Sequence, residues 1–208
     1  MSSDRDMIEA LCTAGDSFYQ RGYAHGSTGN LSVRVGDRVT ITATGGSLRG
    51  LHPDQLAHVD LDGRCLNQHR PSKEAPFHLA VYRTRPEARA IVHLHSPWSV
   101  ALSCLENPEV APVTPYYYMR VAPLGIVPYF RPGSPALAVA VEATARGHRC
   151  MLLRNHGPIC AGASVAEAVD RAEELEATAR LHFALRGEKI QPLGPTEIEE
   201  LLRTFGTP

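Results

Sequence analysis

The chain has 208 residues, of which 43% are hydrophobic and 21% charged, enough to build one domain around a substantial core. Its 21 Lys and Arg residues nearly balance its 22 Asp and Glu residues. That balance argues against a non-specific nucleic-acid binder, and the ordinary apolar content argues against a disordered chain. The chain is rich in histidine, with 10 residues. Because imidazole is the commonest metal ligand in proteins, their placement decides whether a metal site is expected.

The cysteines and the apolar runs indicate where the protein works. Residues 1–6 form no apolar segment of the kind that a secretory signal needs. The longest apolar runs, such as 138–141, are far shorter than the ~20 residues of a membrane helix. The 5 cysteines include no CxxC pair, so we expect reduced thiols. These features predict a cytoplasmic protein with no membrane or nucleic-acid partner.

Helical and strand patterns follow one another along the chain without a strict alternation. Helices are predicted over 4–20, 77–83, 97–105, 135–146 and 164–185. Ser72 is expected to cap the second of them, and Ser164 with Glu167 forms a capping box for the last. Strands are predicted from the Gly-rich turn at 25–30 into Arg34, and over 38–43, 58–61, 88–95, 126–129, 150–153 and 159–162. The mixture predicts an α/β fold with a mostly antiparallel central sheet flanked by helices.

Two histidines stand at the end of the apolar strand 88–95. His93 and His95 are two residues apart, so in a strand they project from the same face, with Leu94 turned into the core. That spacing suits a shared metal ion. Alone, it fits equally well two hydrogen-bonded histidines near a strand end.

A third histidine follows another apolar strand. His156 lies in the tight turn Asn155-His156-Gly157-Pro158, where a single histidine is more often a solvated turn residue. Together with His93 and His95, it completes the three-histidine set of a catalytic zinc site that keeps an open position. Of the others, His25 is a candidate neighbour of the site, and six are assigned to the surface or to packing: His52, His58, His69, His78, His148 and His182.

Three further segments offer polar groups. Ser72-Lys73-Glu74 opens a helix, where free N–H groups suit a phosphate and Glu74 could reach a metal or act as acid/base, although ordinary capping explains the motif as well. The turns at 26–30 and 42–47 are rich in glycine and hydroxyl residues, which suits an anion, and they contribute Thr28 and Gly29 as further candidates. The segment 114–120 offers Tyr117 and Arg120, or else forms an aromatic surface.

Five motifs occur in one order along nearly the whole chain: Gly29-Asn30, Thr44-Gly45, Pro71-Ser72-Lys73-Glu74, His93-Leu94-His95 and Asn155-His156-Gly157. In these motifs the chain resembles the class II aldolase/adducin family, which includes fuculose-phosphate aldolase and ribulose-phosphate 4-epimerase. The resemblance implies one domain over residues 1–208, folded as a three-layer α/β/α sandwich. It also implies one divalent metal ion per subunit, with Zn²⁺ expected, and a homotetramer whose active sites lie between subunits.

The resemblance also assigns roles to residues. It implies that His93, His95 and His156 hold the metal, and that Glu74 is the acid/base and a further metal ligand when substrate is absent. The positions that match phosphate-binding residues are Asn30, Thr44, Gly45 and Ser72. Lys73 stands where the sugar-phosphate aldolases tend to have a second serine, and it would suit a substrate with two anionic ends.

Within the family, the chain is most similar to the 3-oxo-tetronate 4-phosphate decarboxylase branch, in segments such as Thr114-Pro-Tyr-Tyr-Tyr-Met-Arg-Val121. The implied reaction removes CO₂ and gives dihydroxyacetone phosphate through a metal-stabilised enediolate that Glu74 protonates. A sugar-phosphate aldolase or 4-epimerase would need nearly the same site and remains the first alternative. A non-catalytic adducin-like module is disfavoured, because all three histidines and Glu74 are present.

Overall fold

A seven-stranded sheet forms the centre of the computed structural model, which describes residues 4–111 and 113–206. The strand order is β3-β2-β1-β4-β7-β6-β5. The strands are β1 (Asn30–Val35), β2 (Arg38–Thr42), β3 (Leu56–Asp60), β4 (Ala90–His93), β5 (Leu124–Val127), β6 (Cys150–Leu153) and β7 (Gly157–Gly162). The central strands β4 and β7 are buried along their whole length, as expected where helices cover both faces of a sheet.

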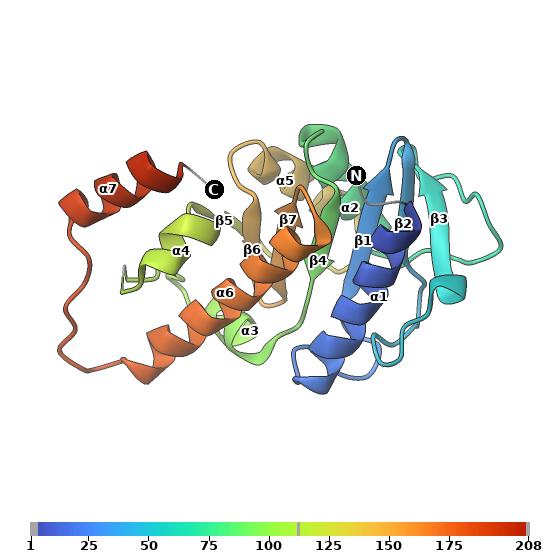
Figure 1. Ribbon diagram of the computed structural model, residues 1–208. Helices are drawn as coiled ribbons and strands as arrows, with labels where there is room; N and C mark the ends of the chain where they lie inside the picture. Colours follow the sequence, from blue (N-terminus) through green and yellow to red (C-terminus); the bar gives the residue numbers. More distant parts are fainter. Residues whose placement is uncertain (1–3, 112, 207–208) are drawn as a thin grey trace.

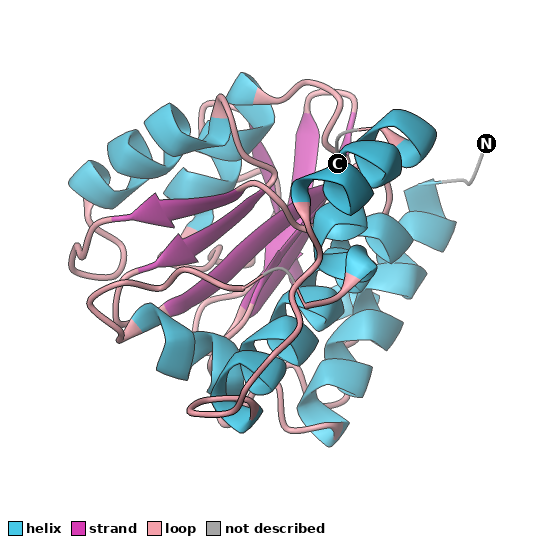
Figure 2. Ribbon diagram, turned by 90° about the vertical axis from the view of Figure 1, so that its left-hand side faces the viewer, coloured by secondary structure: helices cyan, strands magenta, loops and turns pink. Residues whose placement is uncertain are grey.

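Helices cover the sheet on both faces (Figures 1 and 2). One face carries α1 (Asp4–Gln20), α3 (Pro97–Ser103), α4 (Pro115–Arg120) and α6 (Val165–Ala184), and the other carries α2 (Ala75–Thr84) and α5 (Pro135–Ala145). The short helix η1 (Pro53–Gln55) precedes β3, and α7 (Pro195–Phe205) packs against α4. Among the described residues, no helix is both long and apolar enough to cross a bilayer.

Side chains of β4 alternate between the two apolar cores. Val92 belongs to the core under α1 and α6, whereas Ile91 belongs to the core under α2 and α5. His93 therefore points to the α2 side, where its ring meets Phe77 edge-on at 5.3 Å between ring centroids. Leu94 is buried on the opposite side, as its position in the strand predicts.

The sheet is mixed, which corrects the expectation of a mostly antiparallel sheet in one respect. Antiparallel pairs dominate, but β5 and β6 run parallel. The reason is the connection: α5 carries the chain from the end of β5 back to the start of β6, as a parallel crossover requires.

Several predicted boundaries also change. Strand β4 ends at His93, so His95 follows the strand and does not belong to it. Helix α2 begins at Ala75 with Glu74 at its N-cap position, so Ser72 does not cap it; the Ser72 hydroxyl instead accepts the Glu74 backbone N–H at 3.2 Å. The segment 114–120 forms helix α4, and α7 was not predicted.

Candidate metal centre and substrate cleft

Three strand or helix ends meet at one end of the central strands and bring four side chains together. His93 ends β4, His95 follows it, His156 lies in the β6–β7 turn, and Glu74 precedes α2. The candidate ligand atoms of these residues all lie within 4.8 Å of one another. They meet because β4 and β7 are neighbours in the sheet, which places the turn before β7 beside the end of β4.

The turn that carries His156 depends on glycine. Asn155 has a φ of 55° and Gly157 a φ of 154°. A Cβ atom at Gly157 would collide with the Leu94 carbonyl oxygen, so only glycine lets the turn approach the β4 end this closely. The Ser103 hydroxyl also accepts the His156 backbone N–H at 3.2 Å. The backbone therefore holds His156 against the pair from β4.

The imidazoles turn their Nε2 atoms toward one another. His93 donates its Nδ1–H to the Pro158 carbonyl at 2.8 Å, which leaves its Nε2 facing the other candidate ligand atoms. That Nε2 lies 3.2 Å from His95 Nε2, which in turn lies 3.1 Å from His156 Nε2. Glu74 closes the group, with Oε2 at 3.3 Å from His93 Nε2 and Oε1 at 3.4 Å from His156 Nε2.

This donor set fits a divalent metal ion. Glu74 is 4% exposed, and its Oε1 atom is buried without a hydrogen-bond partner. Lone pairs that converge in this way repel one another unless a cation or protons lie between them. Three histidine nitrogens and a carboxylate oxygen are ligands that Zn²⁺ accepts, and the His93 bond to Pro158 fixes the ring in the way that second partners of metal-bound histidines do.

The protonation states of these side chains also fit a divalent metal ion. Burial, with a contribution from His93, lowers the pKa of His95 to about 3 and that of His156 to about 4. Burial raises the pKa of Glu74, but His93, the Asn30 amide and His156 lower it more, so the pKa lies well below its usual range. At neutral pH the His95 and His156 rings are neutral and the carboxylate is ionised, as metal binding requires.

A cleft of about 370 Å³ opens onto this group. Its lining includes His95, His156 and Glu74 together with every predicted phosphate-binding residue and both candidates from the first Gly-rich turn: Thr28, Gly29, Asn30, Thr44, Gly45, Ser72 and Lys73. Ser27, Ala43, Gly46 and Pro132 complete it. The motifs that resemble the family therefore converge on one hollow beside the candidate metal ligands.

The structure shows which donors in the cleft are already occupied. The Thr44 backbone N–H is bonded to the Arg70 carbonyl at 2.9 Å and is therefore occupied, whereas the Thr44 side chain is exposed. The Ser72 oxygen accepts from Glu74, so the Ser72 hydroxyl proton is available for donation. Lys73 is exposed at the rim and offers a positive charge. These groups suit an anion.

Two sequence candidates lie elsewhere in the chain. Tyr117 is buried in the core under α1 and α6 and lines a different hollow, and the guanidinium of Arg120 lies over the Tyr116 ring at 5.6 Å. Neither lines the cleft of its own chain.

One set of polar residues behind Glu74 was not predicted from the sequence. His78, assigned to the surface or to packing, is fully buried and is hydrogen-bonded to Asn30 and Ser32. A signal was present: Glu74, His78 and Tyr82 are spaced four apart, which places them on one face of a helix.

The chain is similar to known proteins over nearly its whole length. Residues 9–183 match the family described as the Class II Aldolase and Adducin N-terminal domain. The 3-oxo-tetronate 4-phosphate decarboxylase of Haemophilus influenzae is 48% identical over 204 residues, which cover 96% of this chain and 97% of that protein. The L-fuculose phosphate aldolase of Methanocaldococcus jannaschii is 38% identical over 178 residues, covering 86% of this chain and 94% of that protein. The crystal structure of YgbL from Klebsiella pneumoniae, 41% identical, matches with a TM-score of 0.92 over 97% of this chain and 100% of that one. The chain belongs to the class II aldolase/adducin family.

Proposed function

We propose that the protein is a metal-dependent lyase that converts 3-oxo-tetronate 4-phosphate to dihydroxyacetone phosphate and CO₂. The observation that carries this proposal is the likeness to proteins of that name, which reaches 48% identity over 96% of the chain. The cleft supports it, because it combines a metal-ligand group with donors for an anion. We place the whole chain, residues 1–208, in one such domain.

The metal site is assigned to His93, His95 and His156, with Glu74 as a fourth ligand when substrate is absent. A divalent metal bound there acts as a Lewis acid and stabilises negative charge that develops on substrate oxygen atoms. We propose Zn²⁺, because histidine nitrogen and carboxylate oxygen are its usual ligands in catalytic sites.

The rest of the cleft is assigned to the two anionic ends of the substrate. Asn30, Thr44, Gly45 and Ser72 would bind the phosphate through amide, hydroxyl and backbone N–H groups, with Thr28 and Gly29 beside them. Lys73 would pair with phosphate or carboxylate at the rim. A charged partner at that position favours a phosphorylated sugar acid over a substrate with one anionic end.

Glu74 is assigned the proton transfer. Loss of CO₂ breaks the bond between C1 and C2 and leaves its electron pair as an enediolate over C2 and C3. Protonation at C2 then gives dihydroxyacetone phosphate. In the resting site Glu74 is ionised, so it must gain a proton before it can donate one. A substrate with two anionic ends would raise the pKa of Glu74 and favour that protonation.

An aldolase acting on a sugar phosphate is the second candidate, because the chain is also 38% identical to an L-fuculose phosphate aldolase. Both reactions pass through an enediolate, so the metal-ligand group alone serves either. A 4-epimerase needs a similar site.

We further propose a homotetramer with active sites between subunits, in the cytoplasm. Exposed apolar side chains at Trp98, Ile126, Tyr129 and Val139 support an association of subunits, in which Arg120 would serve a neighbouring site. All five cysteines are free, which suits a reducing compartment.

A product assay with metal analysis tests the proposal. The purified protein should contain at least about half an equivalent of divalent metal, as tightly held structural or catalytic zinc does. It should release CO₂ and dihydroxyacetone phosphate from the oxo-acid phosphate, and no aldehyde from ketose phosphates. Failure to release CO₂, together with aldehyde release from a ketose phosphate, would establish the aldolase instead. A His93→Ala variant with full activity would contradict the ligand assignment.

A further inference from the structure

A chain of hydrogen bonds leads from the Glu74 carboxylate into the protein interior. Asn30 Nδ2 donates to Glu74 Oε2 at 2.8 Å, and His78 Nε2 lies 2.6 Å from Asn30 Oδ1. Ser32 Oγ lies 2.8 Å from His78 Nδ1 and 2.8 Å from the Tyr82 hydroxyl. Two residues come from β1 and three from the α2 region, so the chain ties the helix to the sheet behind the cleft.

The chemistry of Glu74 fixes the direction of every bond in this chain. An ionised carboxylate only accepts, so the Asn30 amide must turn its nitrogen to Glu74 and its oxygen to His78. His78 must then carry its proton on Nε2, which leaves Nδ1 to accept from the Ser32 hydroxyl. The Ser32 oxygen is left to accept from the Tyr82 hydroxyl, and each donor thus has one acceptor.

The members of this chain are buried and satisfied. His78, Ser32 and Tyr82 are 0% exposed or nearly so, and Asn30 is 5% exposed. Burial lowers the pKa of His78 to about 3 and raises that of Tyr82 well above its usual value, so both stay neutral. An amide that cannot pass on a proton stands between His78 and Glu74. The arrangement therefore holds atoms in place and does not conduct protons.

We propose that His78 is a positioning residue: through Asn30 it fixes the orientation of the Glu74 carboxylate toward the metal ligands, and Ser32 with Tyr82 holds His78. The Asn30 nitrogen has a second proton, so the same side chain can also donate to a ligand in the cleft. The effect on turnover rests on the proposed lyase activity, whereas the effect on the metal site does not.

Two substitutions of His78 separate positioning from mere packing. Glutamine can place an amide N–H where Nε2 stands and keep the bond to Asn30, whereas asparagine reaches only the Nδ1 position. His78→Asn should lower kcat about 10- to 100-fold with KM changed less than about threefold, as expected for a partner of a metal-site residue. His78→Gln should restore kcat to within about threefold of the unmodified protein.

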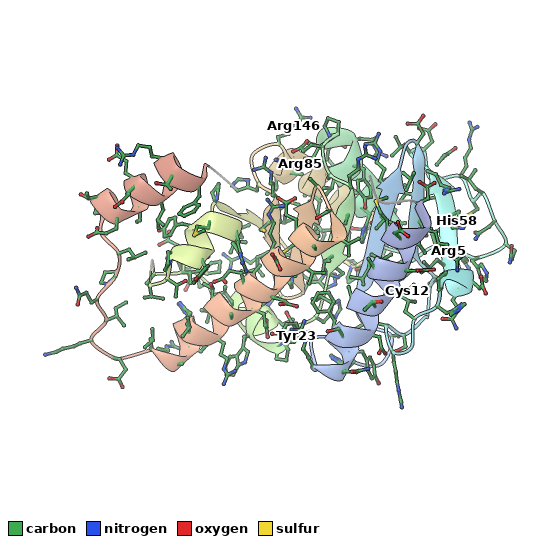
Figure 3. All side chains as sticks on the ribbon, in the orientation of Figure 1. Arg5, Cys12, Tyr23, His58, Arg85 and Arg146 are labelled. Carbon is green, nitrogen blue, oxygen red and sulfur yellow. The ribbon has the colours of Figure 1, made fainter. Side chains whose placement is uncertain are left out.

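A matched control comes from the sheet edge. His58 lies on β3 (Figure 3), and a similar bond joins its ring Nδ1 and Thr40 Oγ1 at 3.0 Å. This bond is not part of the chain to Glu74. His58→Asn should leave kcat unchanged. Equal losses in His58→Asn and His78→Asn would overturn the proposal, as would a His78→Gln variant as impaired as His78→Asn.

A measurement without substrate distinguishes this proposal from the proposed reaction. Zn²⁺ affinity of the metal-free protein, measured by competition with a chromophoric chelator, should fall about 10-fold in His78→Asn and recover in His78→Gln. If the protein releases no CO₂ but this pattern holds, the reaction is wrong and the positioning role stands. Unchanged Zn²⁺ affinity and kcat in His78→Asn would refute the role.

Nitrogen-15 NMR of the unsubstituted metal-free protein covers the case in which a variant does not fold. The His78 ring should carry its proton on Nε2 and none on Nδ1, in a single orientation. A proton on Nδ1 would reverse the hydrogen bonds deduced above and contradict the proposal.

Discussion

Two buried glutamates lie on opposite faces of the sheet and differ in what their carboxylates contact. Glu176 in α6 is 3% exposed and fully satisfied: Oε1 accepts the Trp98 N–H at 2.9 Å, and Oε2 accepts the Ser99 N–H at 2.8 Å and the Ser99 hydroxyl at 2.7 Å. It holds the first turn of α3, where free N–H groups favour a negative charge.

Glu74 is as deeply buried, yet only one of its oxygens accepts a hydrogen bond. Its other neighbours are the Nε2 atoms of His93 and His156, at 3.3 and 3.4 Å. An unsatisfied buried carboxylate oxygen costs stability, so its presence indicates a role that offsets the cost. The contrast shows that burial alone does not mark a functional acid; the convergence of three histidines on the carboxylate does.

The largest effect should come from Glu74→Gln, which keeps the shape of the side chain and removes its charge. We expect kcat to fall about 10²- to 10⁴-fold, the usual contribution of a general acid/base. The metal-free variant should stay folded, because the amide can keep its oxygen toward Asn30 and donate its N–H to His156. Product assays and thermal unfolding of the same preparation measure both quantities. A variant that is inactive because it unfolds would break the comparison with Glu176.

Glu176→Gln should do the opposite. The new amide group must set an N–H against one of the donors at the start of α3, so we expect a loss of about 1.5–3 kcal/mol in the free energy of unfolding. Turnover of the folded variant should stay within about threefold of the unmodified protein, because Glu176 lies outside the cleft. Denaturant unfolding and steady-state kinetics provide the check. A kcat lowered more than about threefold in the folded variant would show that α3 positions His95.

The helices and strands differ in how well the sequence alone predicts them. The helix over 4–20 is confirmed as Asp4–Gln20, and the strand over 150–153 as Cys150–Leu153, because local periodicity and capping determine such elements. Helix α4 was not predicted, because its six residues read as an aromatic surface and the packing of Tyr117 into the core came from contacts distant in sequence. The strong apolar stripe of α7 was overlooked.

The metal-ligand group was only half visible in the sequence. The spacing of His93 and His95 indicates a pair, but the meeting with His156 depends on the neighbourhood of β4 and β7, which periodicity does not reveal. The position of His156 after another apolar strand made it the candidate third ligand, and the family resemblance supported that step. The link from Asn30 to His78 crosses from β1 to α2, so no local motif could predict it.

Acidification should destabilise the unsubstituted protein and should act on the Glu74 region. The pKa values of His78 and His95 fall from an ordinary 6.5 to about 3, and that of His156 to about 4, because these rings are buried. The unfolded chain therefore binds more protons than the folded chain below about pH 6.5, and stability present above that pH is lost as the pH falls toward 4. Thermal unfolding of the metal-free protein at about pH 7 and about pH 5 should show a lower melting temperature in acid.

Two variants serve as controls for this pH dependence. His78→Gln has one ring fewer to protonate and should lose part of the dependence, whereas Glu176→Gln retains all three rings and should keep it. An equal pH dependence in both variants would show that the acid sensitivity arises outside the Glu74 region.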